Sequence, residues 1–157
     1  EAIAQLSNEN IYYSICGKGI NEKELKMLIE KRHLEKQVRL LGYRTDMEEI
    51  LQCADCFAFP SHREGLGIAA IEALLCGVPL IAADNRGTRE YAINGGNSIV
   101  CKSNCVEDFK NAIYLFCSDK TMHSHMASLC RASAEKFTIN EVEKTMKEIY
   151  KKALISL

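Results

Sequence analysis

The sequence has no excess of charge of either sign. Its 20 Lys and Arg residues stand against 21 Asp and Glu residues, and the formal net charge is -1. This balance gives no electrostatic footprint for nucleic acid, so we expect no nucleic-acid partner. The chain also has no internal repeat, no low-complexity segment and no recognisable signal peptide. It begins at Glu1 rather than Met, which we interpret as the start of a segment of a longer protein.

Long hydrophobic runs are absent as well. The longest apolar stretch, residues 68–83, is interrupted by Glu72, Gly77 and Pro79. A helix that crosses a membrane needs about 20 predominantly apolar residues. The sequence therefore predicts no membrane-spanning segment.

The eight cysteines do not form a complete set of metal ligands. Cys53 and Cys56 make one C-x-x-C pair, but a structural zinc site needs a second close pair at a suitable spacing. Cys101 and Cys105 are four residues apart and have no nearby His. We therefore expect reduced thiols in a cytoplasmic protein, and no metal site.

Strand-like and helix-like segments alternate along the chain, and 157 residues with 47% hydrophobic content suit one domain over residues 1–157. The alternation predicts an α/β fold, a Rossmann-like parallel sheet with helices on both faces. The expected strands are residues 10–16, 37–41, 56–59, 79–83 and 98–101. The expected helices are residues 22–31, 46–53, 66–76, 106–117, 121–136 and 140–157, the last being a C-terminal helix.

Four polar loops follow these strands. They are residues 17–19, 42–46, 60–67 and 84–90, and they hold most of the glycines. Ligands of parallel α/β sheets bind at the carboxyl ends of the strands, so we expect these loops on one rim.

The loop of residues 60–67 leads directly into a helix. Gly65 and Gly67 remove side chains where a backbone approaches a ligand. Free N–H groups in the first turn of the helix, with its dipole, suit an anion such as a diphosphate. A simple tight turn also explains Gly-x-Gly, and for that pattern alone it is the better explanation.

Glu72 adds a second signal. It lies among Ala, Ile and Leu residues on a helix with almost no polar face, where a carboxylate is costly unless it is paired. A narrow solvent-exposed strip or an internal Arg partner would account for it structurally. The functional interpretation is that Glu72 binds ligand hydroxyls. Glu64, eight residues earlier, lies in the loop near the anion site, and two acids so placed suit a diphosphate that carries two sugars.

Glu64 and Glu72 form a Glu-x7-Glu pattern that resembles the retaining glycosyltransferases of family four, which have two facing Rossmann-like domains (GT-B type). The surrounding segments resemble that family too, and the local sequence is most similar to bacterial capsule and exopolysaccharide glycosyltransferases. These segments are residues 17–19, 41–43, 54–61, 64–67, 72–74, 76–82, 86–90 and 97–100.

The resemblance implies a nucleoside-diphosphate-sugar donor, with a UDP-sugar expected, and no metal or other cofactor. It implies that Glu72 binds the ribose hydroxyls and that Glu64 is the catalytic-site acid that binds and positions the transferred sugar. The remaining expected donor-binding residues are Gly65, Leu66 and Gly67 at the diphosphate, Ser61 beside them, and Gly17, Tyr43 and Arg44 around the nucleoside.

The chain departs from the family pattern before Glu1. The family carries an Arg and a Lys for the diphosphate there, along with a central first strand and the N-terminal acceptor domain. We therefore expect the C-terminal, donor-binding half of the enzyme, with its first strand missing and without activity on its own. Arg63 or Arg44 offers some replacement positive charge.

Transfer with retention to a saccharide or lipid-linked acceptor is thus the expected activity of the whole enzyme, in capsule, exopolysaccharide or lipopolysaccharide synthesis. Such an enzyme would be cytoplasmic or peripheral at the inner face of the membrane. A nucleotide-sugar epimerase or phosphorylase of the same architecture and a non-catalytic nucleotide-binding module stay open as alternatives. A phosphoacceptor regulator would need an acidic cluster after an early strand, and none follows Cys16.

Overall fold

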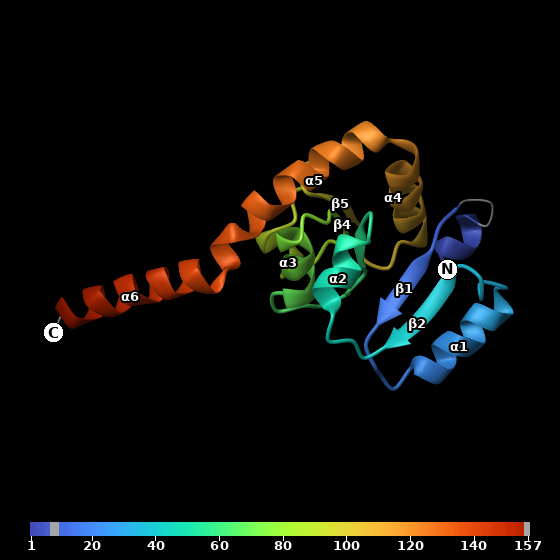
Figure 1. The fold of residues 1–157 in the computed structure, drawn as a ribbon, viewed down its shortest axis with the longest axis horizontal. Helices are drawn as coiled ribbons and strands as arrows, with labels where there is room; N and C mark the ends of the chain where they lie inside the picture. The colour runs from blue at the N-terminus through green and yellow to red at the C-terminus, as the bar shows by residue number, and fades with distance from the viewer. Residues whose placement is uncertain (7–9, 156–157) are drawn as a thin grey trace.

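The computed structural model describes residues 1–6 and 10–155, in which short parallel strands alternate with helices (Figure 1). The strands are β1 (Tyr13–Cys16), β2 (Val38–Gly42), β3 (Phe57–Phe59), β4 (Leu80–Ala83) and β5 (Ser98–Cys101). The α-helices are α1 (Glu22–Lys31), α2 (Met47–Gln52), α3 (Ile68–Leu75), α4 (Val106–Ser118), α5 (Lys120–Ala134) and α6 (Ile139–Ile155). Three short 3₁₀ helices are η1 (Ile3–Leu6), η2 (Thr88–Glu90) and η3 (Glu135–Phe137).

All strand pairs are parallel, as expected for an α/β fold, but the strands form two separate ladders. β1 pairs with β2, and Tyr13 stands opposite Val38. β4 lies between β3 and β5 and pairs with both, and Ile81 stands opposite Ala58 and Ile99. Within the described ranges no ladder joins β1 or β2 to the other three strands.

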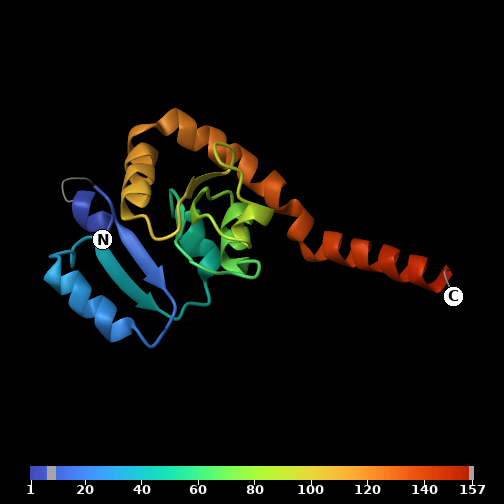
Figure 2. The same cartoon turned by 180° about the vertical axis from the view of Figure 1, so that it is seen from behind.

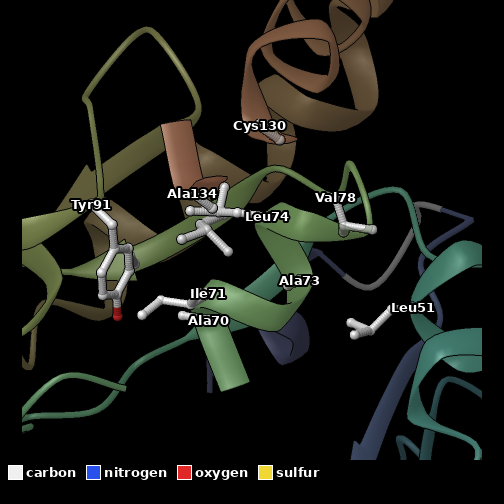
Figure 3. Close-up of a cluster of buried hydrophobic side chains, with 11 residues drawn as sticks. Leu51, Ala70, Ile71, Ala73, Leu74, Val78, Tyr91, Cys130 and Ala134 are labelled. Atoms are coloured by element: carbon white, nitrogen blue, oxygen red, sulfur yellow. The ribbon is translucent and has the colours of Figure 1, made fainter. Parts of the chain in front are cut away.

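The core is built on both faces of β4, whose four residues are all fully buried. Leu80 and Ala82 face one way and pack with Leu74 of α3 and with Cys130 and Ala134 of α5, as Figure 3 shows for the helical residues. Ile81 faces the other way and packs against α4 and the start of α5, with Ala112, Phe116 and Met126. An apolar strand that is buried on both faces is typical of a parallel sheet covered by helices.

The region before α2 is packed more lightly. We call residues 10–42 the β1–β2 region and residues 51–137 the β3–β5 region. Helix α1 has no buried residue, and the buried apolar side chains of the β1–β2 region are Ile11, Leu34 and Val38. None of them belongs to either of the two core clusters, which both lie in the β3–β5 region.

Helix α6 projects away from the rest of the molecule, and both views show this (Figures 1 and 2). It has no buried residue. Val142, Met146 and Ile149 lie on one face of the helix and are 47%, 41% and 52% exposed. This apolar face is therefore uncovered in the structure. None of the helices in the described ranges combines the length and the apolar character that a bilayer crossing demands.

The predicted elements agree with the observed ones in type and order. Strand β1 begins at Tyr13 instead of residue 10, and α3 begins at Ile68 instead of residue 66. Gly67 has φ 81°, a left-handed conformation that cannot continue a right-handed helix backwards into the loop. Gly77, with the same φ, ends the helix as predicted.

Candidate donor-binding site

Glu64 lies on the loop of residues 60–67, between β3 and α3. Its Oε1 accepts a hydrogen bond from the Ser61 hydroxyl at 2.7 Å. The backbone of the loop is tied to the end of β4, because the side-chain amide of buried Asn85 donates to the Ser61 carbonyl at 2.8 Å. Asn85 is held in turn by Thr88, whose amide donates to Asn85 Oδ1 at 3.0 Å. The loop that carries Glu64 is thus fixed by the neighbouring strand.

Three successive amides at the start of α3 are free. The N–H groups of Gly65, Leu66 and Gly67 donate to no residue in the described part of the chain. These amides precede the first turn of an eight-residue helix, where the dipole favours negative charge. The structure therefore brings a carboxylate, Glu64, next to a group of donors that can bind phosphate oxygens.

The two glycines of this loop serve different purposes. A Cβ on Gly67 would lie 2.7 Å from the Tyr91 hydroxyl and 2.9 Å from the Phe59 ring, and its φ is left-handed. Gly67 is therefore required by the protein's own packing. A Cβ on Gly65 would meet no atom within 4 Å, and its φ is not in the left-handed region. The protein leaves open space over Gly65, and this is where a ligand can approach the backbone.

Sequence reasoning missed two residues that support this loop, Gly87 and Tyr91. A Cβ on Gly87 would lie 3.0 Å from Glu64 Cβ and 3.1 Å from the Glu64 carbonyl oxygen, so Glu64 packs directly on that glycine. The Tyr91 hydroxyl touches the loop at Gly67. Burial, and then the negative charge of Glu64, raise the pKa of Tyr91 to about 12. The resemblance to the family reached Glu90, but nothing in the sequence indicated that the next side chain contacts residue 67.

Glu72 is placed differently from the sequence expectation. It is exposed, on a face of α3 that it shares with exposed Ile68 and Ala69. One side of this helix is uncovered, so Glu72 lies on a solvent-exposed strip, which is one of the structural explanations that the sequence left open. A burial penalty does not explain Glu72, and its assignment to the ribose depends on the Glu-x7-Glu spacing.

The predicted nucleoside loops belong to the other ladder. The Gly17 amide donates to the Gly42 carbonyl at 2.7 Å, which joins the loops after β1 and β2. Tyr43 is 71% exposed. Arg44 donates from Nε to Asp46 Oδ1 at 2.8 Å and from Nη2 to Oδ2, and this lowers the pKa of the Asp46 carboxyl. Arg44 is therefore already neutralised by Asp46.

Other polar residues are arranged for structure. Over residues 1–6 and 10–155, no group of three or more His, Cys, Asp or Glu side chains is arranged to hold a metal ion. The eight cysteines, which all lie in the described ranges, form no disulfide. His123 contacts two other segments, since its Nε2 lies 2.8 Å from the Asp55 carbonyl oxygen and its ring stands edge-on to Phe116. His62 is an exposed residue of the same loop, with Nδ1 3.5 Å from the Asn104 amide.

Comparison with known families gives the class of protein. A family model described as "Glycosyl transferases group 1" matches residues 1–134. This match covers most of the chain, so the chain belongs to the group 1 glycosyl transferases, and the resemblance to family four is confirmed.

Two relatives agree with this assignment. The chain is 31% identical over 120 residues to an Escherichia coli enzyme named UDP-Gal:alpha-D-GlcNAc-diphosphoundecaprenol alpha-1,3-galactosyltransferase, covering 76% of the chain and 31% of that enzyme. It is 26% identical over 117 residues to the Campylobacter jejuni N,N'-diacetylbacillosaminyl-diphospho-undecaprenol alpha-1,3-N-acetylgalactosaminyltransferase, covering 74% of the chain and 31% of that enzyme.

The fold is that of the GT-B enzymes. The chain superposes on Anabaena HepE, crystallised with UDP and glucose, with a TM-score of 0.88 and 26% identity. The match covers 99% of the chain and 43% of HepE. The chain thus spans less than half the length of the proteins it matches.

Proposed function

We propose that this chain is the donor-binding part of a retaining glycosyltransferase that uses a nucleoside-diphosphate sugar, with a UDP-sugar as the donor. The observation that carries the proposal is the juxtaposition of the Glu64 carboxylate with three free amides of residues 65–67, at the start of α3. Carboxylates bind sugar hydroxyls, whereas free amides at a helix start bind phosphate. Both parts of a nucleotide sugar therefore find complementary groups on one loop.

Each predicted residue has a role in this proposal. The amides of Gly65, Leu66 and Gly67 bind the diphosphate, Glu64 with Ser61 binds the transferred sugar, and exposed Glu72 binds the ribose. Gly17, Tyr43 and Arg44 flank the nucleoside.

Departure of the diphosphate builds up negative charge, which the amides and the helix dipole stabilise without a metal ion. Exposed Arg63 lies on the same loop and can add positive charge. Arg44 contributes little, because Asp46 already pairs with it.

A second domain is also part of the proposal. The uncovered apolar face of α6, formed by Val142, Met146 and Ile149, is the surface to which an acceptor-binding domain of the same protein would pack.

We infer that the acceptor is a saccharide or a lipid-linked saccharide, because the names of the Escherichia coli and Campylobacter jejuni relatives specify diphosphoundecaprenol-linked acceptors. This activity suits polysaccharide, capsule or lipopolysaccharide synthesis by an enzyme in the cytoplasm or at the inner face of the membrane.

The two acids give the test. Glu72→Gln should weaken UDP binding about ten- to hundredfold, because a hydrogen bond to a charged carboxylate contributes about 1.5–3 kcal/mol. Glu64→Gln should leave UDP affinity within about twofold and remove the additional affinity that the glucose of UDP-glucose provides. Calorimetry with UDP and with UDP-glucose measures both effects. Glu148→Gln, an exposed acid on α6, is the matched control. If both variants bound both ligands like the parent, the two acids would not belong to a donor site.

A further inference from the structure

The Tyr91 hydroxyl is buried without a hydrogen-bond partner. Tyr91 is 3% exposed, and its hydroxyl oxygen bonds to no residue that the structure describes. Its ring packs edge-on against Phe137, with centroids 6.2 Å apart, and lies beside Ile71 and Ala70 of α3 (Figure 3). A buried, unpaired hydroxyl costs free energy that a phenylalanine in the same place would not cost. Packing alone therefore does not explain a tyrosine at this position.

The segment of residues 87–91 lies directly beneath the loop that carries Glu64. At one end, Gly87 supports Glu64, since an added Cβ would lie 3.0 Å from Glu64 Cβ and 3.1 Å from the Glu64 carbonyl oxygen. At the other end, the Tyr91 hydroxyl would lie 2.7 Å from a Cβ on Gly67. The hydroxyl is thus held against the same loop, three residues from the acid.

The Glu64 carboxylate can accept a further hydrogen bond, and the Tyr91 hydroxyl has no acceptor among the described residues. Its Oε1 already accepts from Ser61, whereas Oε2 bonds to none of the described residues. An ionised carboxylate can accept about four hydrogen bonds. Because burial and the Glu64 charge keep the pKa of Tyr91 near 12, the phenol stays protonated and can donate. A donor and an acceptor, both incompletely used, therefore lie on the two sides of one loop.

We propose that Tyr91 is a positioning residue for Glu64, whose carboxylate accepts a hydrogen bond from the Tyr91 hydroxyl when a nucleotide sugar occupies the site. Ser61 and Tyr91 then hold the carboxylate from two sides, and its remaining lone pairs face the hydroxyls of the transferred sugar. This inference rests on the donor site proposed above. It adds a residue that acts on the sugar end of the ligand and leaves the nucleotide end unaffected.

The first experiment replaces only the hydroxyl. Tyr91→Phe should keep UDP affinity within about twofold and should lower UDP-glucose affinity about fivefold to tenfold, because the acid that binds the sugar is less well oriented. Urea unfolding of Tyr91→Phe should give a free energy of unfolding equal to or above that of the parent. Tyr114→Phe, a half-exposed tyrosine of α4, is the control and should change none of these values.

A spectroscopic readout separates positioning from simple packing. With tyrosine labelled at 13Cζ, the Tyr91 resonance should move when UDP-glucose is added and should stay in place when UDP is added. In the free protein, Glu64→Gln should lower the pKa of Tyr91, since it removes the charge that helps to raise it.

The outcomes are distinguishable. Equal weakening of UDP and UDP-glucose by Tyr91→Phe, or a lower free energy of unfolding with unchanged affinities, would make Tyr91 a structural residue and overturn the proposal. If the parent bound neither UDP nor UDP-glucose, the donor site itself would be wrong, and the role of Tyr91 would be lost with it.

Discussion

The β3–β5 region of this molecule is packed more closely than the β1–β2 region. In the β3–β5 region, Leu74, Leu80 and Ile81 are fully buried, and helices cover both faces of β4. In the β1–β2 region, α1 buries none of its residues. The loop with Glu64 belongs to the first region, and the loops with Gly17 and Tyr43 belong to the second. The groups proposed for the diphosphate and sugar, and Glu72 for the ribose, are therefore held on a close-packed support, whereas the loops proposed to flank the nucleoside are not.

This contrast suits a division of labour at the site. Groups that act on the reacting sugar and phosphate must be placed accurately, because small displacements there are costly in rate. The loops that flank the nucleoside can adjust to it. The contacts around each loop agree with this division. Asn85, Gly87 and Tyr91 all support the Glu64 loop, whereas Tyr43 is largely exposed.

The largest effect on stability should come from truncating a buried side chain in the more closely packed β3–β5 region. Leu74→Ala should lower the free energy of unfolding by about 2–5 kcal/mol, because Leu74 is fully buried between α3, β4 and α5. The same substitution at Leu25, which is only partly buried on α1, should cost about 1 kcal/mol or less. Urea unfolding followed by circular dichroism measures both. Equal losses would show that the two regions are packed alike and would contradict the difference in packing between them.

How far the sequence predicts this structure can be seen at particular residues. The apolar run at β4 and the glycine at position 77 are local signals, and both strand and helix end were predicted from them. The loop with Glu64, Gly65 and Gly67 was also predicted, because a polar, Gly-rich segment between a strand and a helix can be recognised from the sequence alone.

The remaining features depend on contacts between segments far apart in the chain. The exposure of Glu72 depends on whether another element covers that face of α3, and no local pattern reveals this. The break between the ladders depends on whether β1 finds a partner other than β2. Tyr91 was missed because its hydroxyl meets Gly67 only after η2 has folded beneath the loop.

A smaller effect should separate the two glycines of the loop. Gly67→Ala should lower the free energy of unfolding by about 1–3 kcal/mol, since it combines a left-handed φ with a clash against Tyr91 and Phe59. Gly65→Ala should change it by no more than about 0.5 kcal/mol, because the space over Gly65 is open. Although Gly65→Ala should leave the protein stable, it should weaken UDP binding roughly tenfold, because the added methyl group keeps the ligand from the amides. Unchanged UDP affinity in Gly65→Ala would place the phosphate elsewhere.

The last expected effect is a loss of stability in alkali, to which buried thiols of the β3–β5 region contribute. Burial raises the pKa of the Cys101 and Cys130 thiols to about 11, from 9.0 for a free thiol. A group whose pKa is raised by folding contributes its full stability below the unfolded pKa and loses it as pH rises through the folded value. The free energy of unfolding should therefore be level up to about pH 9 and fall between about pH 9 and 11.

Cys130→Ala isolates one of these thiols. Cys130 is fully buried between α3 and α5, so the variant should be less stable than the parent at pH 7.5. Its decline with pH should nevertheless be shallower, because one thiol no longer has to ionise on unfolding. Urea unfolding of parent and variant in steps from pH 7.5 to 10.5 measures both slopes, and Cys53→Ala, an exposed thiol, is the control. Parallel slopes for the parent and Cys130→Ala would show that ionisation of this buried thiol does not couple to unfolding, and the alkaline loss would then have to arise outside this part of the core.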